Sequence, residues 1–166
     1  MDLNGLIERF SDTTEHRQKA IFSTLFIAGN KLQTLFDRRI PELSLKQFML
    51  LSIVRQADGR LTLTQLGTLL GCSRQNIKKI ADALERKGFI AIRPSANDTR
   101  ASWICPTEKA AAYFEHEFPA YQKELKHLFA VYSEDEITTL FTLLTKLYAG
   151  IDNLEQKTVN QEASHG

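Results

Sequence analysis

The sequence predicts a mainly α-helical protein with one small β-hairpin after its midpoint. Apolar residues recur at helical spacing over most of the 166 residues, whereas residues 89–105 contain two short β-branched and aromatic segments around a turn. Hydrophobic residues make up 43% of the chain and charged residues 25%, as in ordinary globular proteins. The length suits one domain with a sizeable core, or one domain with an added oligomerisation element.

Residues 1–39 are expected to form two amphipathic helices. The first is short, and its apolar positions are Leu3, Leu6, Ile7 and Phe10. The second is predicted to begin at a cap made by Asp12 with Glu15 and to end before Pro41, because proline pushes the preceding residue out of helical geometry. Its apolar stripe consists of Phe22, Leu25, Phe26, Leu32, Leu35 and Phe36.

A third helix is predicted to begin at Ser44 and Gln47, which stand at the spacing of a capping box. Its centre, residues 48–54, is apolar almost all round, so other elements must enclose it. The dipeptide Asp58-Gly59 predicts a turn, and residues 61–62 suggest a short strand.

Residues 64–88 predict two helices joined by a tight turn. Thr64 carries the hydroxyl expected to cap the first helix, and Gly71 suits the left-handed conformation that ends it. Ser73 stands where the cap of the second helix belongs, and Gly88 stops that helix. The stripe that the second helix turns toward a core consists of Ile77, Ile80, Ala81 and Leu84.

The opposite face of the second helix is polar and basic. It collects Gln75, Lys79, Asp82 and Arg86, flanked by Arg74 and Lys78 on one side and Asn76 on the other. Amides and guanidinium groups can pair with base edges and lysines can neutralise phosphates, as in a recognition helix that enters the DNA major groove. The alternative is the solvated face of an ordinary helix.

The distribution of charge favours a nucleic-acid partner more than the net charge of +1 does. Residues 72–100 hold seven Lys/Arg and three Asp/Glu, a balance of +4, whereas the rest of the chain holds 14 and 17, a balance of −3. A local basic patch on a mildly acidic body is typical of a DNA-binding surface.

Residues 89–93 and 101–105 are predicted to pair as strands, which completes a winged helix-turn-helix. Arg100 at the tip of this wing can reach a phosphate or the minor groove, and Asp98 can orient it; the alternative is a surface ion pair that contributes little. We expect Gln75, Asn76 and Lys79 to lie nearest the base edges. The full set of predicted DNA-binding residues is Ser73, Arg74, Gln75, Asn76, Lys78, Lys79, Asp98 and Arg100.

The residues Leu63–Gly67, Leu70–Ile77 and Leu84–Ile90 resemble the winged helix-turn-helix of the MarR-type regulators (multiple antibiotic resistance regulators). The wing is similar through Asp98-x-Arg100, and Thr107–Lys109 is similar to the start of the next helix. The chain departs from the family pattern at Ser95, Pro106 and Ala110, where Asp, Leu and Gly are usual. The resemblance implies a transcriptional regulator.

Members of this family often respond to small aromatic or phenolic molecules that bind between the DNA-binding lobe and the dimerisation helices. The residues of this chain expected to line such a crevice are Phe26, Phe48, Leu51 and Tyr113. The alternative, which the sequence favours, is that these residues are plain core.

The C-terminal third predicts two further helical segments. Residues 107–131 form a long helix that either kinks at Pro119 or breaks there into two, and Ser133 with Glu136 is a capping box that opens the last helix. The polar residues from Gln156 onward suggest a frayed tail. The apolar stripe of the last helix consists of Ile137, Leu140, Phe141, Leu144, Leu147, Tyr148, Ile151 and Leu154.

The two chain ends are expected to build a homodimer, because a winged-helix lobe cannot cover their apolar faces. We assign residues 1–39 and 107–155 to dimerisation helices, residues 44–106 to the DNA-binding lobe and residues 156–166 to a flexible tail. The predicted dimer contacts are Leu3, Leu6, Ile7, Phe10, Ile137, Leu140, Phe141, Leu144, Leu147, Tyr148 and Ile151. The alternative is a helical bundle within one chain.

The sequence indicates neither an enzyme nor a cofactor or metal site. The glycines are scattered at turns, and His16, His116 and His127 do not stand at metal-ligand spacing. Cys72 in the turn and Cys105 at a strand end suggest small packed side chains, so we expect no catalytic or redox role for either thiol. Because neither a signal peptide nor a membrane span is apparent, we expect a cytoplasmic protein.

Together these patterns predict a sequence-specific, double-stranded-DNA-binding transcriptional regulator that acts as a repressor. It would bind a near-palindromic operator as a homodimer, with release by a small aromatic or phenolic effector as a further hypothesis. The main alternative is a winged-helix protein-interaction module, which would need neither the polar row of the recognition helix nor the wing arginine.

Overall fold

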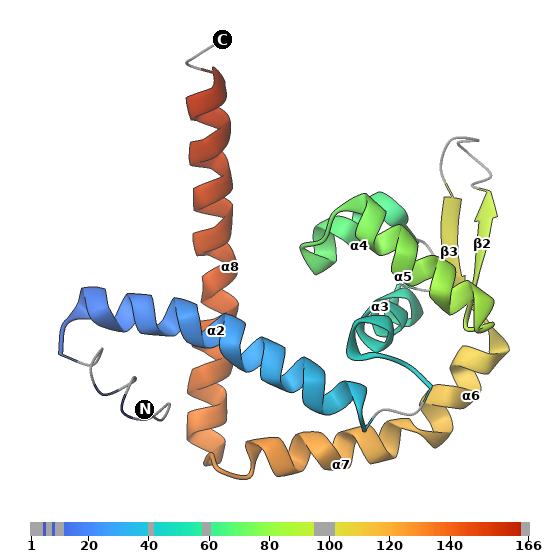
Figure 1. The fold of residues 1–166 in the computed structure, drawn as a ribbon, viewed down its shortest axis with the longest axis horizontal. Coiled ribbons are helices and arrows are strands. Elements are labelled where there is room, and N and C mark those ends of the chain that lie inside the picture. Colours follow the sequence, from blue (N-terminus) through green and yellow to red (C-terminus); the bar gives the residue numbers. More distant parts are fainter. Residues whose placement is uncertain are drawn as a thin grey trace. The chain divides into compact units, whose positions relative to one another are not determined.

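The computed structural model describes residues 5, 8, 12–39, 42–57, 61–94 and 102–163, with side chains up to residue 157. These residues form α-helices and one small antiparallel sheet (Figure 1), which confirms the predicted mainly α class with a β-wing. The chain divides into two compact units, Met1–Phe118 and Pro119–Gly166. The predicted short helix with Leu3, Leu6, Ile7 and Phe10 and the predicted turn at residues 58–59 lie outside the described residues.

The first unit contains the sheet and most of the helices. In chain order its elements are α2 (Thr14–Asp37), α3 (Leu45–Gln56), β1 (Leu61–Thr62), α4 (Leu63–Leu70), α5 (Arg74–Arg86), β2 (Ile90–Pro94), β3 (Ser102–Pro106) and α6 (Glu108–His116). The second unit consists of α8 (Glu134–Ala163) and nearly all of α7 (Phe118–Phe129).

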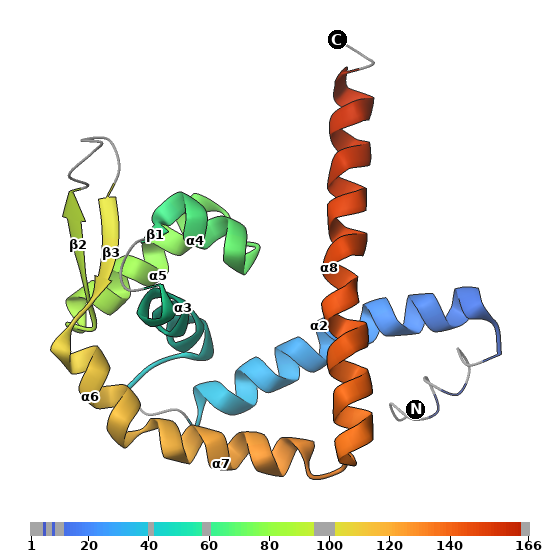
Figure 2. The ribbon, with the colours of Figure 1, turned by 180° about the vertical axis from the view of Figure 1, so that it is seen from behind.

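The sheet has β3 at its centre, with β1 on one edge and β2 on the other (Figure 2). Both pairings are antiparallel, and Ile92 of β2 lies opposite Ile104 of β3. The two hairpin strands are each assigned one residue later than predicted, and Phe89 lies in the connection between the end of α5 at Arg86 and β2. Its backbone N–H donates to the Leu84 carbonyl at 3.0 Å, and its side chain is fully buried.

The core of the first unit forms around α3, as its nearly continuous apolar sequence predicts. Leu50, Leu51 and Val54 have no exposed surface, although Met49 on the remaining face is 47% exposed. The other elements contribute the fully buried residues Leu66 of α4, Ile77, Ala81 and Leu84 of α5, and Ile104 of β3. The stripe predicted on α5 is therefore its core-facing side, with Ile80 half-buried at its margin.

Several predicted helix caps are confirmed. Ser44 and Gln47 form the capping box of α3, and the Ser73 hydroxyl accepts from the Asn76 N–H at the start of α5. Ser133 likewise accepts from the Glu136 N–H at 3.2 Å, while its own N–H donates to the Glu136 carboxylate at 2.8 Å. These caps join residues three apart in sequence, which is why the local pattern reveals them.

Two predicted caps are wrong by one or two residues. Thr13 rather than Asp12 caps α2 by accepting from the His16 N–H, while Asp12 accepts from the His16 ring at 2.6 Å. This hydrogen bond to His16 lowers the pKa of the exposed Asp12 carboxyl. At α4 the cap is Thr62, in a capping box with Gln65, and the predicted Thr64 lies inside the helix.

The C-terminal third contains a helix break near Pro119 and a last helix that is longer than predicted. The segment after Thr107 breaks into two helices at Glu117, just before Pro119, because proline lacks the N–H that a continuous helix would need there. Helix α8 continues to Ala163, through residues that we expected to be a frayed tail. Residues 156–163 contain neither proline nor glycine, so nothing in their sequence stops the helix.

Candidate nucleic-acid interface

Helices α4 and α5 are joined by a turn that depends on two glycines. Gly71 ends α4 with a φ of 61°, in the left-handed region that glycine tolerates best. The chain then folds back so closely that the Cys72 N–H donates to the Gly67 carbonyl at 2.9 Å. A Cβ atom on Gly67 would lie 2.8 Å from the Cys72 carbonyl oxygen, so this position needs glycine. The turn brings α5 across α4 as a helix-turn-helix does.

The predicted recognition residues form the solvent side of α5. The exposed side chains at its start and along its outer face are Arg74, Gln75, Asn76, Lys78, Lys79 and Arg86. The buried stripe with Ile77 and Leu84 fixes the rotation of the helix, because these side chains must face the core. The amide and cationic groups are therefore held on one solvent-exposed face of the helix.

Lys78 already has an intramolecular partner on this face. Its ammonium group lies 2.8 and 3.0 Å from the two carboxylate oxygens of Asp82, one helical turn away. Both side chains are more than a third exposed, so the pair contributes little to stability and a phosphate can replace the carboxylate.

The wing is tied to α5 by a contact that the sequence analysis missed. The Glu85 carboxylate accepts from the backbone N–H of Ile92 in the edge strand β2 at 3.0 Å. No local pattern reveals this bond, because it joins a helix to a strand through a turn. Arg93, exposed near the end of β2, is a basic wing residue that we also did not select. The predicted wing residues Asp98 and Arg100 lie outside the described residues.

Three of the four predicted pocket residues are part of the packed core. Phe48, Leu51 and Tyr113 are buried, and the Phe114 ring lies 5.6 Å from Phe48 and 6.0 Å from Tyr113 between ring centroids. Burial, together with the nearby carboxylates of Glu117 and Glu42, raises the pKa of Tyr113 to about 12. Phe26 differs, since it packs against Phe22 of the same helix and is 61% exposed.

The apolar stripe of α8 is exposed within the second unit. Except for the half-buried Leu140, its predicted dimer residues Ile137, Phe141, Leu144, Leu147, Tyr148 and Ile151 are all exposed. Leu144 and Leu147 are 43% and 42% exposed, respectively. Much of the predicted stripe of α2 is exposed as well, and of its six residues only Phe36 is buried.

The described residues contain no group of three or more His, Cys, Asp or Glu side chains placed to hold a metal ion. His16 is engaged with Asp12, and neither His116 nor His127 joins such a group. Cys72 and Cys105 are half-buried free thiols. Over the same described part of the chain, none of the helices has the length and hydropathy of a membrane span.

Comparison with known proteins gives matches over this region and beyond it. The model of the MarR family matches residues 43–102. The transcriptional repressor MprA of Escherichia coli K12 is 32% identical over 114 residues, which are 69% of this chain and 65% of that protein. The alignment thus spans just under two thirds of the relative's length.

Solved structures with the same fold cover more of the chain. A MarR/EmrR family transcriptional regulator from Acinetobacter sp. ADP1 superposes with a TM-score of 0.72 at 19% identity, over 82% of this chain and 97% of that one. A mutant of E. coli MarR, complexed with operator DNA, superposes with a TM-score of 0.71 at 22% identity, over 82% and 99%. At these identities the likeness establishes the fold.

Proposed function

From the match of residues 43–102 to the MarR family model and the identity to MprA, we propose that the chain is a MarR-family protein and a sequence-specific, DNA-binding repressor of transcription. The observation that carries the proposal is the row of exposed amide and cationic side chains at the start of α5, on a helix whose rotation the core fixes. A recognition helix contacts base edges with these N-terminal residues. The name of the relative MprA, a transcriptional repressor, supports repression rather than activation of transcription.

We also propose that the active form is a homodimer built by α8 and the N-terminal helices. Burying one leucine-sized side chain contributes roughly 1.5–3 kcal/mol, so the exposed stripe of α8 can supply enough free energy to offset the entropic cost of association. A twofold dimer presents two recognition helices about one DNA turn apart. The operator should then be a near-palindrome with half-sites ~10 bp apart, centre to centre.

Selection of bound sites from a random DNA library tests this function directly. We expect one enriched near-palindrome, bound with an affinity that falls steeply between about 50 and 200 mM salt because phosphate contacts release counterions. Failure to enrich any sequence, together with salt-independent binding of another protein, would favour the protein-interaction module instead.

Replacing Lys78 with alanine is expected to weaken binding to all DNA sequences alike. The substitution removes one cation that can neutralise a phosphate, so a plot of log affinity against log salt should become shallower by about one unit. Titrations of operator and random duplexes at several salt concentrations measure both effects. An unchanged slope would show that Lys78 stays paired with Asp82 and does not contact phosphate.

Replacing Gln75 with alanine is the matched change at a predicted base contact, and it should act differently. A bidentate amide–adenine contact is worth about 1–3 kcal/mol of discrimination, so the variant should lose preference at one position of each half-site. The salt slope should not change, because no charge is removed. Equal losses on operator and random DNA would exclude Gln75 from base reading.

We further propose that a small aromatic or phenolic molecule regulates DNA binding. The support comes from the aromatic side chains of Phe26 on α2, Phe48 on α3 and Tyr113 on α6, of which Phe48 and Tyr113 are buried and Phe26 is exposed. To release the protein from DNA, an effector must bind the state that cannot bind DNA more tightly than the state that can, because equal affinities would leave the equilibrium between them unchanged. If a panel of aromatic acids changed neither the melting temperature nor the operator affinity, this part of the proposal would be wrong.

A further inference from the structure

The loop before α3 contains an unusual backbone conformation. Glu42 has a φ of 60° and is the one non-glycine among the described residues with a positive φ. An L-residue in this region is strained, and such strain persists only where surrounding contacts hold it. The next residue, Leu43, is buried in the core, so the loop cannot relax freely.

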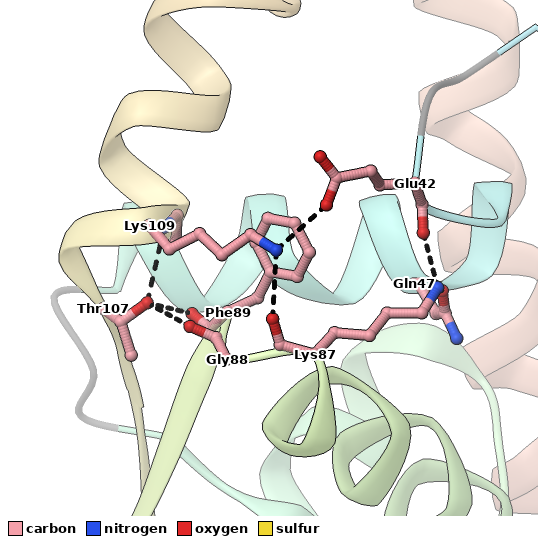
Figure 3. Close-up of polar contacts among 8 residues, drawn as sticks. Glu42, Gln47, Lys87, Gly88, Phe89, Thr107 and Lys109 are labelled. Atoms are coloured by element: carbon pink, nitrogen blue, oxygen red, sulfur yellow. Dashed lines mark hydrogen bonds and ion pairs between the residues drawn. The ribbon is translucent and has the colours of Figure 1, made fainter.

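Two lysines contact Glu42, one at its carboxylate and the other at its backbone carbonyl (Figure 3). The Lys87 ammonium donates to the Glu42 backbone carbonyl and to the Gln47 side-chain oxygen, the latter at 3.0 Å. The Lys109 ammonium pairs with the Glu42 carboxylate at 2.9 Å. We refer to Glu42, Lys87 and Lys109 as the clamp.

The clamp joins segments that are distant in sequence. Lys87 is the C-cap of α5, Lys109 lies in the first turn of α6, and Gln47 belongs to the capping box of α3. Lys109 also donates to the Lys87 carbonyl at 3.2 Å and lies 4.3 Å above the centre of the buried Phe89 ring. The end of the recognition helix is thereby fixed to the loop before α3 and to α6.

The same junction provides hydrogen-bond donors to the carbonyl groups of two residues between α5 and β2. The Thr107 hydroxyl donates to the Gly88 carbonyl at 2.7 Å, and the Thr107 N–H donates to the Phe89 carbonyl at 3.1 Å (Figure 3). The C-terminal end of α5 carries partial negative charge, which attracts the nearby ammonium groups of Lys87 and Lys109. Both electrostatics and hydrogen bonds therefore favour one position of this helix end.

From this geometry we propose that Glu42 and Lys109 are positioning residues for DNA recognition: they act through Lys87 to set the position of α5 and need no contact with DNA themselves. The inference rests on the proposed DNA-binding function. It predicts that breaking the clamp misplaces intact recognition side chains, and that the two residues affect DNA affinity as a unit.

The test is a double-mutant cycle on operator affinity with Glu42→Gln, Lys109→Met and the double variant. Glutamine keeps the backbone carbonyl that Lys87 contacts, and methionine keeps the apolar stem over Phe89. Each single variant should lose about two- to fivefold in operator affinity, the range of an exposed ion pair, with an unchanged salt slope. The double variant should lose no more affinity than Lys109→Met alone, because Glu42→Gln breaks only the ion pair that Lys109→Met already removes.

Two control variants separate positioning from a general loss of charge. Lys109→Arg keeps the cation and should retain wild-type affinity. Glu15→Gln breaks another exposed ion pair, with Lys19 on α2, and should also have no effect. Additive losses in the cycle, or unchanged affinities, would overturn the proposal. A salt slope reduced by about one unit in Lys109→Met would do the same, since it would make Lys109 a phosphate contact.

Amide hydrogen exchange of the free protein provides a readout that does not depend on DNA. The N–H groups of Gly88 and Phe89 donate to the last turn of α5 and should exchange faster in both single variants. The Cys72 N–H in the helix-turn-helix turn should keep its protection as an internal reference. Failure of the wild type to bind any DNA would refute the proposed function, whereas unchanged exchange at the end of α5 would refute the clamp.

Discussion

Replacing both Leu144 and Leu147 with aspartate is expected to abolish operator binding by separating the proposed dimer. Both leucines lie on the exposed apolar stripe of α8. At roughly 1.5 kcal/mol or more for each side chain, and with both protomers changed, dimerisation should weaken by at least about 6 kcal/mol. Light scattering should then give a mass near the 18.9 kDa of one chain, and the operator shift should disappear.

A matched substitution on the other face of α8 controls for the added charge. Thr142 is exposed, its hydroxyl only bonds back to the Thr138 carbonyl, and it lies opposite the apolar stripe at 100° per residue. Thr142→Asp should therefore leave both the mass and the operator affinity as in the wild type. A wild-type mass near 18.9 kDa at micromolar concentration would contradict the dimer from the outset.

The sequence predicted those features of the fold that depend on residues close together in the chain. Ser44 with Gln47 and Ser73 with Asn76 are pairs three residues apart, so the local pattern placed the starts of α3 and α5 correctly. The buried stripe of α5 followed from helical periodicity alone. Because this stripe must face the core, the periodicity also identifies the opposite, solvent-facing side of α5.

Features that depend on distant partners were missed or misplaced. Thr62 and Thr64 both suit a helix cap, and the choice between them is coupled to the pairing of β1 with β3, where Thr62 lies opposite Trp103. The contact between Glu42 and Lys109 spans 67 positions, and neither residue belongs to a local motif that points to the other. Periodicity and capping rules cannot predict pairs of residues that are so far apart in the sequence.

The candidate site contains both kinds of feature: side chains that a local pattern predicts, and contacts between residues distant in the sequence. The polar row on α5 could be identified from the sequence, since a helix displays its residues at fixed angles. The contacts that hold α5 in place could not, because Lys87 is ordinary in sequence and gains its role from the fold around it. The side chains expected to read DNA are thus visible in the sequence, whereas those that position them appear only in the structure.

Replacing Gly67 with alanine is expected to lower the free energy of unfolding by about 1–3 kcal/mol, the usual cost of forcing an extra carbon into a packed site. The added Cβ would meet the Cys72 carbonyl oxygen at 2.8 Å, and that oxygen belongs to the backbone of the helix-turn-helix turn. It cannot move aside as a flexible side chain would. Urea unfolding measures the loss, which should lower the midpoint at an unchanged m-value.

Replacing two other glycines with alanine tests whether the close approach of the Cys72 carbonyl causes the expected loss of stability in Gly67→Ala. Gly29 lies inside α2 with nothing within 4 Å of an added Cβ, so Gly29→Ala should stabilise the helix by up to about 1 kcal/mol. Gly71 is equally open but has a φ of 61°, so Gly71→Ala tests backbone strain alone, at a cost of about 1–2 kcal/mol. A gain in stability from Gly67→Ala, as expected for Gly29→Ala, would mean that the close approach of Gly67 and Cys72 does not constrain the turn.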